Sequence, residues 1–441
     1  MKRILIKDLP QKIGQKVTIA GWVNSRRDHG KIIFMDIRDR SGLIQTVVIP
    51  DQEEAYEKAK KIKNEFVVEI EGKVKERPGE TTNKAQVSNV EIEIENLKII
   101  SSTKEELPVE ITKENINLNL ETLLNHRSLI LRNEKIKSIF KIYATLLDAY
   151  NFIMRQNDFL EIKTPKILSN ATEGGANFFK IKYFDRDAFL AQSPQFYKQA
   201  GVSVFERVFE IGSVFRAEPH FTTRHLNEYV SLDAEMGFIE GFEDIMDQLE
   251  KVITFIIKEI NKQHKKEINQ YNIDSVSIPK KGIPRLRLDE AREILKKEMG
   301  KEIEKADIDP EGERLIGEYA KKEWESDFVF LTHYPVTVRP FYTMPDFQNK
   351  KLTFSFDLIF RGVEIATGGQ RIHDYYQLID NMKKHKLDPN DYKHYLDIFR
   401  YGMPPHGGWG MGSERIVQKI LGLNSIKEAV LFPRDVKRLT P

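Results

Sequence analysis

The chain has 441 residues, of which 40% are hydrophobic and 31% charged, values typical of a folded globular protein with room for two or three domains. Its 69 basic and 67 acidic residues give a net charge of +2, so charge alone does not indicate a nucleic-acid-binding protein. Because cysteine is absent, disulfides and thiolate metal sites are excluded, and a metal would need oxygen or imidazole ligands. Neither a membrane-spanning apolar run of roughly 20 residues nor a secretory signal is recognisable, so we expect a cytoplasmic protein with no membrane partner.

The first hundred residues are rich in short runs of alternating apolar and polar residues. Between residues 15 and 100 we expect five strands, with one polar helical stretch, Asp51–Lys63, after the third. This order is typical of an OB-fold, a small barrel that often binds oligonucleotides, although another small β-barrel or sandwich fits the same pattern. We therefore predict a first domain over residues 1–104, a linker over 105–125 and a second domain over 126–441.

An amphipathic helix is predicted near the start of the second domain, over residues 134–156. Its apolar residues recur every three or four positions from Ile136 to Met154, and it ends before a short strand that Pro165 closes. The pattern on its own indicates only that one face of this helix is packed.

The next predicted element is a β-hairpin with a charged loop. Its arms, Val208–Phe215 and Leu226–Phe238, interleave apolar and polar residues. Five residues that bind anions or pair with cations fall within the ten positions between the arms: Arg216, Glu218, His220, Arg224 and His225. We interpret this segment as an anion-binding hairpin, with a solvated loop as the alternative.

Helices and strands follow one another irregularly through the rest of the chain. Helices are predicted over Phe242–Gln263, Leu288–Met299 and Glu311–Trp324, in a helical connecting region of about residues 241–325, and a final helix begins near Ser413. Strands are predicted near Phe328–Thr332, Val336–Phe341, Thr353–Phe360 and Val363–Gly368. Successive antiparallel strands with helices at their flanks indicate an α+β fold.

Several short motifs accompany the hairpin. Asp357 and Glu364 stand seven residues apart, and they are followed by GGQR at 368–371 and GGWGMGSER at 407–415. The other motifs are ATEGGANFF at 171–179, QSPQFYKQ at 192–199, RPFYTMPD at 339–346 and the C-terminal FPRDVKRLTP. In this order they resemble the class II aminoacyl-tRNA synthetases, most closely the aspartyl branch in its short, archaeal form. The resemblance extends over essentially the whole chain.

This resemblance implies an activity and a set of partners. It implies an N-terminal OB-fold that binds the anticodon and a class II catalytic domain that ligates L-aspartate to tRNA-Asp through an aspartyl-adenylate. ATP and Mg²⁺ would take part, and the chain would form a homodimer through the helix over 134–156 and the Pro165 region. Whether tRNA-Asn is a second substrate stays open at this point.

The resemblance also implies which residues bind ATP. Arg216 would grip the α-phosphate, Tyr229 would stack on the adenine where most relatives carry Phe, and Arg415 would cover its other face. The implied ATP-binding set is Arg216, Ala217, Glu218, Arg224, His225, Leu226, Tyr229, Glu364, Gly412, Ser413, Glu414 and Arg415. Arg216, Arg415 and Glu364 would be the catalytic residues, and the motif glycines would let the backbone approach the nucleotide.

Asp357, Glu364 and Thr367 are the implied magnesium ligands. Mg²⁺ prefers one or two carboxylates together with substrate oxygens, which suits this pair of acidic residues. Without the motifs around them, two carboxylates on strands are more often solvent-facing.

Lys198 and Arg371 are the residues that the resemblance assigns to the side-chain carboxylate of aspartate. Asparagine would leave their buried positive charge unpaired, a penalty of roughly 3–5 kcal/mol, so no editing site is expected. The full set implied for aspartate is Glu173, Ser193, Gln195, Lys198, Arg216, Asp233, Thr367 and Arg371, with Glu173, Ser193, Gln195 and Asp233 around the α-ammonium group.

Phe34, Arg38 and Gln45 are the implied anticodon-binding residues, in the pattern FxxxRDxxGxxQ. An aromatic ring can stack on a splayed base while an amide reads its edge, although Phe34 could equally be a barrel-core residue. Three rival functions remain: an asparaginyl-tRNA synthetase, an amidating asparagine synthetase on the same catalytic fold, and a non-enzymatic RNA-binding paralogue.

Overall fold

The computed structural model describes residues 2–77, 89–169, 177–219, 222–277, 279, 281–303 and 306–441. The chain divides into two compact units, Met1–Asn117 and Leu118–Pro441, and this division falls inside the segment predicted as a linker. Over the ranges just given, no helix has both the length and the apolar character that crossing a bilayer requires.

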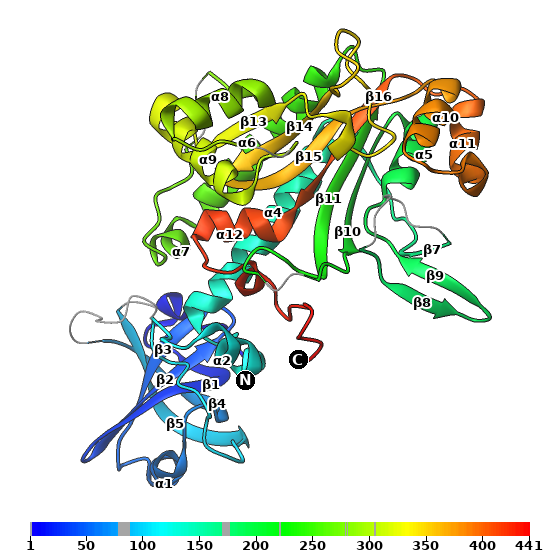
Figure 1. The fold of residues 1–441 in the computed structure, drawn as a ribbon. Helices are drawn as coiled ribbons and strands as arrows, with labels where there is room; N and C mark the ends of the chain where they lie inside the picture. Colours follow the sequence, from blue (N-terminus) through cyan, green and yellow to red (C-terminus); the bar gives the residue numbers. More distant parts are fainter. Residues whose placement is uncertain are drawn as a thin grey trace. The chain divides into compact units, whose positions relative to one another are not determined.

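The first unit is a closed five-stranded barrel, which confirms the predicted OB-fold (Figure 1). Its elements are the 3-10 helix η1 (Ile6–Lys12), β1 (Lys16–His29), β2 (Ile32–Asp39), β3 (Gly42–Val48), α1 (Glu53–Lys61), β4 (Val67–Glu76) and β5 (Val90–Ser101). The strand order is β1-β2-β3-β5-β4, and antiparallel pairing of β1 with β4 closes the barrel. The inward residues of each strand, such as Ile19, Ile37 and Ile70, form its core.

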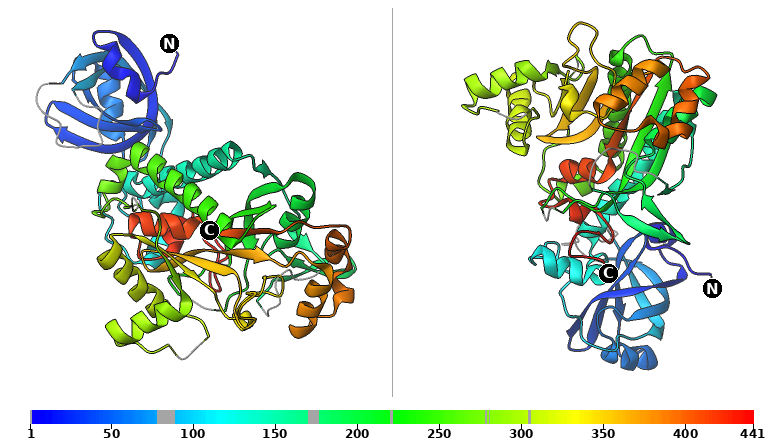
Figure 2. Two further views of the ribbon diagram at one scale, coloured as in Figure 1. Left: turned by 90° about the horizontal axis from the view of Figure 1, so that it is seen from above. Right: turned by 45° about the vertical axis from the view of Figure 1, so that its right-hand side comes forward.

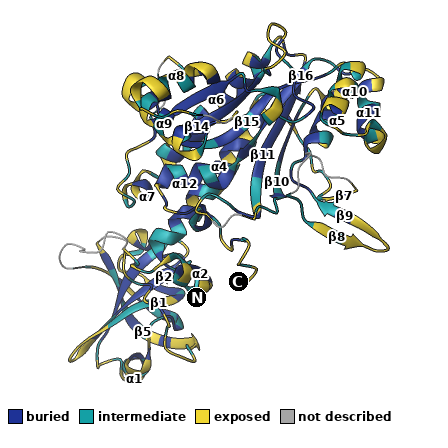
Figure 3. Cartoon of the chain, viewed as in Figure 1, coloured by how far each residue is buried: buried dark blue, intermediate teal, exposed yellow. Residues whose placement is uncertain are grey.

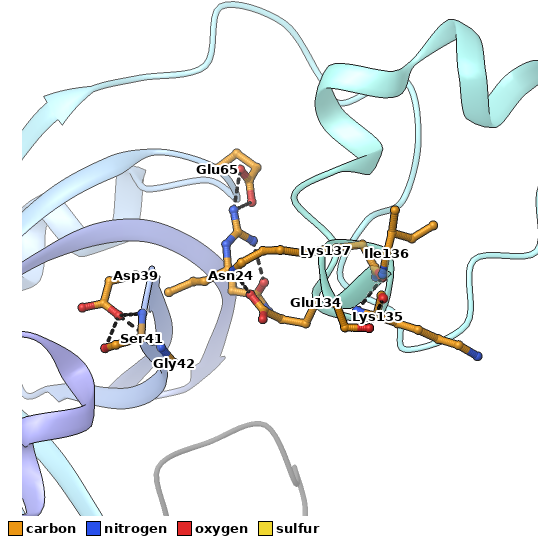
Figure 4. A network of polar contacts seen from close by, with 12 residues as sticks. Asn24, Asp39, Ser41, Gly42, Glu65, Glu134, Lys135, Ile136 and Lys137 are labelled. Carbon is orange, nitrogen blue, oxygen red and sulfur yellow. Dashed lines mark hydrogen bonds and ion pairs between the residues drawn. The ribbon is translucent and has the colours of Figure 1, made fainter. Parts of the chain in front are cut away.

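Two polar clusters brace the barrel (Figure 4). The buried Arg38 guanidinium donates two hydrogen bonds of 3.0 Å to Glu65 and one of 3.0 Å to Asn24. Asp39 Oδ1 accepts hydrogen bonds from Ser41 and from the backbone N–H of Gly42, which fixes the tight turn between β2 and β3. The Arg-Asp-x-x-Gly part of the motif therefore has a structural cause.

The second unit contains an eight-stranded sheet in the order β12-β13-β14-β15-β16-β11-β10-β6. These strands are β12 (Arg285–Arg287), β13 (Phe328–Thr332), β14 (Ser355–Phe360), β15 (Val363–Arg371), β16 (His406–Gly412), β11 (Glu228–Gly237), β10 (Arg207–Phe215) and β6 (Leu160–Glu161). Neighbouring strands are antiparallel except at the two ends of the sheet, where β12 pairs with β13 and β6 with β10 in parallel. The predicted α+β class is thus confirmed.

Three helices pack on this sheet and make the main core (Figure 1): α4 (Glu134–Gln156), α6 (Phe242–Gln263) and α12 (Ser413–Leu421). The side chain of Asn133 caps α4 by accepting from Lys135 and Ile136 N–H at 3.1 Å each, beside the labelled first turn in Figure 4. The apolar face of α4 lies in the core of its own chain. In Figure 3 the middle of the sheet is correspondingly dark blue.

The remaining predicted helices are α8 (Leu288–Glu298) and α9 (Pro310–Trp324), which cover the β12–β13 end of the sheet. The strand predicted over Val336–Phe341 is wrong: its first residues form the 3-10 helix η2 (Val336–Val338). Pro335 precedes the predicted strand and Pro340 lies within it, and proline cannot donate the backbone hydrogen bond that strand pairing needs.

Several elements were not predicted. They are α2 (Leu120–Asn125), α3 (Arg127–Ile130), β7 (Ile167–Leu168), β8 (Lys180–Tyr183), β9 (Arg186–Leu190), α5 (Gln195–Phe205), α7 (Lys265–Asn269), α10 (Tyr375–Lys384), α11 (Lys393–Arg400), the 3-10 helices η3 (Pro389–Tyr392) and η4 (Ile426–Ala429), and η1, β12 and β16, whose bounds are given above. Strands β7, β9 and β8 form a separate small sheet. Helix α5 carries Lys198, and α11 packs beside it, since the rings of Phe196 and Tyr395 stack with 4.1 Å between their centres. Figure 2 shows the orange segment that contains α10 and α11 in two further views.

Candidate active site

A cavity of about 430 Å³ lies in the second unit. The predicted residues that line it are Ser193, Gln195, Lys198, Arg216, Glu218, Arg224, His225, Leu226, Tyr229, Asp233, Glu364, Thr367, Arg371, Gly412, Glu414 and Arg415. Of the other predicted residues, Ala217, Ser413 and Asp357 stand outside this lining, and Glu173 lies outside the described residues. Segments more than 200 residues apart in sequence, from α5 to α12, thus converge on one cavity.

Lys198 lies at one end of the cavity and is 2% exposed. Its Nζ donates to Asp233 Oδ1 and to the backbone oxygen of Trp409, both at 2.9 Å, and stands 3.5 Å from Glu235 Oε2. Two hydrogen bonds and one ion pair therefore hold the ammonium group in place. This arrangement fixes a buried positive charge at the cavity wall.

Arg371, at the end of β15, is the second buried cation at this end. Its Nε donates to Glu235 Oε1 at 2.9 Å and its Nη2 to the backbone oxygen of Gly408 at 3.0 Å. The guanidinium also stands 5.4 Å from the centre of the Tyr342 ring, a cation–π contact. Glu235 thus bridges Lys198 and Arg371.

Glu235 is a residue that sequence reasoning missed. It is fully buried and does not itself line the cavity. Burial would raise the pKa of Glu235, but the charges of Arg371 and Lys198 outweigh it and hold that pKa below its ordinary value. Glu235 is therefore ionised beneath the two cations, while burial lowers the pKa of the neighbouring His406 to about 4 and keeps that imidazole neutral.

The pairing of these charges was not predicted from the sequence. Lys198 and Arg371 were expected to point at the side-chain carboxylate of the substrate. In the structure the two cations face two carboxylates of the chain itself, Asp233 and Glu235, so this group of four is neutral as a whole. Selectivity for an anion must then depend on what else contacts Asp233.

Two neighbours of Lys198 offer polar atoms to the same end of the cavity. Gln195, at the start of α5, is buried, and its Nε2 has no hydrogen-bond partner among the described residues. Ser231 Oγ donates to Asp233 Oδ2 and holds that carboxylate in place. A buried amide with an unused donor is expected to be satisfied by a ligand or by water.

Arg216, Glu218, Arg224 and His225 of the charged hairpin loop line the cavity as well, while His220 lies outside the described residues. Arg216 lies over Tyr229, with 5.9 Å between the guanidinium carbon and the ring centre. Asn227, which the sequence analysis did not single out, donates from its side chain to the backbone oxygen of Arg216 at 2.7 Å, and its own N–H donates to Arg434 O at 2.9 Å. Asn227 thereby ties the loop to the C-terminal segment FPRDVKRLTP.

Arg415, in the first turn of α12, also lines the cavity. Its Nη1 donates to the backbone oxygen of Glu364 at 2.7 Å and lies 3.6 Å from that residue's carboxylate. The adjacent Ser413 and Glu414 point into the structure: Ser413 Oγ donates to Val230 O, and Glu414 Oε1 accepts from Val230 N–H at 3.0 Å. These two residues hold α12 on β11, which places Arg415.

The predicted metal ligands occupy adjacent strands. Thr367 Oγ1 donates to Glu364 Oε1 at 2.9 Å, and Asp357 Oδ2 accepts from Arg339 at 2.7 Å. The other oxygen, Asp357 Oδ1, is buried without a hydrogen-bond partner in the part of the chain that the structure describes. Burial, reinforced by the nearby Glu364, raises the pKa of Asp357 to about 6, although the positive charge of Arg339 opposes this rise.

A divalent cation would fit this donor set. Mg²⁺ needs one or two carboxylates and completes its shell with water and phosphate oxygens. Nowhere in the described ranges do three or more His, Cys, Asp or Glu side chains gather into a fuller metal cage. The residues present therefore suit a cation that arrives with an anionic ligand.

The glycines of β16 serve two different purposes, close packing of the sheet and lining of the cavity. A Cβ on Gly407 would stand 2.1 Å from Ile245 of α6, and one on Gly408 would stand 2.0 Å from Ala234 O. The expectation that these two glycines clear space for a nucleotide is wrong, since they allow close packing of the sheet and do not line the cavity. Gly410 and Gly412 do line it.

The predicted anticodon residues lie in the first unit. Phe34 is half-buried and makes an edge contact with His29, with 5.8 Å between ring centres. Gln45 donates to Glu91 at 2.9 Å and accepts from the half-exposed Arg27 at 3.2 Å. Arg38 is buried in its pair with Glu65, so a supporting role corrects the direct base contact predicted for it.

Comparison with known proteins agrees with this geometry. Residues 119–436 match the family described as tRNA synthetases class II (D, K and N), and residues 17–100 match an OB-fold nucleic acid binding domain. The chain is 45% identical to the aspartate–tRNA(Asp/Asn) ligase of Aeropyrum pernix, covering 97% of this chain and 96% of the relative. It is 43% identical to the aspartate–tRNA(Asp) ligase of Pyrococcus abyssi, with 97% of each covered.

Among solved structures, asparaginyl-tRNA synthetase from Pyrococcus horikoshii complexed with asparaginyl-adenylate is similar, with a TM-score of 0.91, 34% identity and 100% of each chain covered. The family match covers most of the chain, and the relatives are matched over nearly their full length. The chain belongs to the class II tRNA synthetases of the D, K and N group.

Proposed function

We propose that this chain ligates L-aspartate to tRNA-Asp through an aspartyl-adenylate. The observation that carries the proposal is the pair of buried cations, Lys198 and Arg371, at the end of a cavity whose other end is lined by Arg216, Arg224 and Arg415. The first pair suits a side-chain carboxylate, and the second group suits a triphosphate. The two relatives reported above carry aspartate ligase names, which supports the same reading.

The first reaction is activation of the amino acid. The α-carboxylate of aspartate attacks the α-phosphorus of ATP, the bond to the pyrophosphate leaving group breaks, and aspartyl-adenylate forms. Because the nucleophile is already ionised, no protein base is required, and fixed orientation supplies much of the acceleration. Arg216 stabilises charge on the α-phosphate while Arg415 and Arg224 hold the outer phosphates. A terminal ribose hydroxyl of tRNA then takes the aspartyl group and releases AMP.

Asp357, Glu364 and Thr367 would hold Mg²⁺ beside the phosphates. The cation would neutralise part of the charge that develops on the leaving pyrophosphate. Two observations support this assignment: Asp357 Oδ1 has no hydrogen-bond partner among the described residues, and the charge of the nearby Glu364 raises the pKa of Asp357. Pyrophosphate exchange should stop in EDTA and return with added Mg²⁺; exchange that persists in EDTA would contradict the assignment.

The proposed choice of aspartate over asparagine rests on a charge count. Lys198 and Arg371 contribute two positive charges, and Asp233 and Glu235 contribute two negative ones. If the substrate's α-ammonium group contacts Asp233 while its α-carboxylate faces the α-phosphorus and Arg216, the ammonium charge needs one more negative charge near Lys198 and Arg371. The aspartate side chain supplies that charge. Asparagine would leave one buried positive charge unpaired, a penalty of ~3–5 kcal/mol. This count disfavours the asparaginyl rival even though an asparaginyl enzyme is a structural relative.

The barrel would bind the anticodon. The half-buried ring of Phe34 on β2 can stack on an unpaired base. The half-exposed Arg27 lies on the neighbouring strand β1, and Gln45, which accepts a hydrogen bond from Arg27, lies on β3. An amidating asparagine synthetase would have no use for a barrel that binds an anticodon. A non-enzymatic RNA-binding paralogue would have no use for the cavity lined with cations.

The chain is also proposed to form a homodimer through α4 and the Pro165 region. The apolar face of α4 lies in its own core, but Phe152 on its outer side and Leu160 on the edge strand β6 are exposed. An exposed strand edge with apolar side chains is suited to pairing with a second copy. Light scattering should give twice the chain mass of 51.4 kDa, and a monomer would contradict the proposal.

Aminoacylation with two amino acids and two purified tRNAs tests the function directly. We expect transfer of aspartate to tRNA-Asp and no transfer of asparagine to either tRNA. Aspartate transferred to tRNA-Asn as well would extend the proposal to relaxed tRNA choice. Transfer of asparagine to tRNA-Asn alone would overturn it in favour of an asparaginyl enzyme.

Replacing Lys198 by leucine tests the carboxylate pocket. Lys198→Leu should abolish aspartate-dependent pyrophosphate exchange, because the substrate carboxylate loses one cation and Asp233 loses its partner. Lys182→Leu, at a lysine that is 77% exposed, is the matched control and should exchange normally. Near-normal exchange by a folded Lys198→Leu variant would remove this lysine from the pocket.

Replacing Phe34 by alanine tests anticodon binding. Stacking of a base on an aromatic ring contributes ~1–3 kcal/mol, so Phe34→Ala should raise the KM for tRNA-Asp roughly five- to a hundredfold. Pyrophosphate exchange without tRNA should be unchanged. Phe184→Ala, at a ring that is 87% exposed in the second unit, serves as the control. An unaltered KM for tRNA in the Phe34 variant would refute the stacking role.

A further inference from the structure

Glu313 lies on α9, in the helical connecting region, and it does not line the cavity. Its side chain is nonetheless only 13% exposed. One carboxylate oxygen, Oε2, accepts two hydrogen bonds: one from Arg224 Nη2 and one, at 3.0 Å, from the backbone N–H of Glu364. A single acidic group thus joins the charged loop of the hairpin to the strand that carries a predicted metal ligand.

The helix that carries Glu313 is packed tightly against the turn between β14 and β15. A Cβ on Gly317 would stand 2.5 Å from the backbone nitrogen of Gly362. Gly362 has a φ of +73°, and a Cβ there would stand 2.8 Å from Arg314 Cα. Because both glycines let the two backbones touch, α9 cannot shift along its axis without displacing this turn. The position of Glu313 relative to Glu364 is therefore fixed by backbone packing.

The carboxylate of Glu364 is held separately from its backbone. Thr367 Oγ1 donates to it at 2.9 Å, and Arg415 stands 3.6 Å away. Glu313 holds the backbone N–H of the same residue. The orientation of Glu364 is thus set from three directions, two of them from outside its own strand.

Arg224 benefits from its partner in a different way. Its side chain is partly exposed and comes from a loop, so without a partner it would sample many rotamers. A guanidinium has five N–H donors in a planar fork, and one Nη bound to Glu313 leaves the remaining donors for a phosphate. A carboxylate on one side of the fork orients the other side, as preorganised electrostatic sites require.

We propose that Glu313 is a positioning residue for the nucleotide, which sets Arg224 and Glu364 relative to each other before ATP binds. It acts through these two residues and does not touch the substrate. The inference rests on the proposed function, since it takes the triphosphate of ATP as the ligand of Arg224. It predicts that a helix of the connecting region determines affinity for ATP and leaves affinity for aspartate unaffected.

The variant Glu313→Gln separates the two contacts. The glutamine oxygen can still accept from Glu364 N–H, but the negative charge that holds Arg224 is lost. In pyrophosphate exchange we expect the KM for ATP to rise roughly tenfold, which corresponds to ~1.4 kcal/mol, with the KM for aspartate unchanged. Glu318→Gln is the matched control, because Glu318 lies on the same helix, 57% exposed, in a surface pair with Arg314.

A double-mutant cycle with Arg224→Ala distinguishes positioning from general weakening of the fold. If Glu313 acts through Arg224, adding Glu313→Gln to Arg224→Ala should change the KM for ATP by less than twofold. Additive effects, or a KM for ATP in Glu313→Gln that is unchanged or lower than in the unsubstituted chain, would overturn the inference. Absence of exchange in the unsubstituted chain would instead count against the proposed function, so the two failures are distinguishable.

Discussion

The cavity depends on a set of four buried charges: Lys198 and Arg371 facing Asp233 and Glu235. The register of the sheet creates it. Asp233 and Glu235 are two residues apart on β11 and therefore point to the same face. Their partners on the neighbouring strand β16 are Gly410 and Gly408, respectively. A Cβ on Gly408 would stand 2.5 Å from Glu235 Oε2. A Cβ on Gly410 would likewise stand 3.3 Å from Asp233 Oδ1, so glycine opposite each residue leaves room for its carboxylate.

The proposed choice of aspartate over asparagine rests on the same four charges. Buried charges left without a partner are strongly destabilising, whereas a complete set of pairs is tolerated. Our charge count is complete only when the ligand brings an ammonium group and a second carboxylate. In the proposed function, the cavity selects its amino acid by the balance of buried charges, and close shape matching is of secondary importance.

Sequence patterns predicted much of the fold for identifiable reasons. The helix over Phe242–Gln263 was predicted with its observed bounds because its apolar stripe is continuous. The hairpin strands were predicted within two residues because their arms alternate and their loop is charged. Val336–Phe341 was misassigned because its apolar residues resemble a strand, although Pro335 precedes it and Pro340 lies within it. Helix α5 was missed because its short apolar pattern was interpreted only as a motif.

The site was predictable to the extent that its residues belong to contiguous motifs. Lys198, Arg216 and Arg415 were found this way, and all three line the cavity. Glu235 and Glu313 were not found, because a buried carboxylate in a strand or a helix has the same local pattern as a solvent-facing one. Arg38 shows the converse, since its motif position suggested RNA contact while its burial against Glu65 assigns it to the barrel. Burial and pairing arise from tertiary structure, which a local pattern does not encode.

The most direct test of the central claim is a crystal structure of the full chain with a non-hydrolysable analogue of aspartyl-adenylate. We expect the side-chain carboxylate of the analogue to lie within hydrogen-bond distance of Lys198 Nζ and of the Arg371 guanidinium, with Glu235 still bound to Arg371 and the ammonium group against Asp233. A carboxylate held by neutral amides, with either cation turned toward solvent, would contradict it.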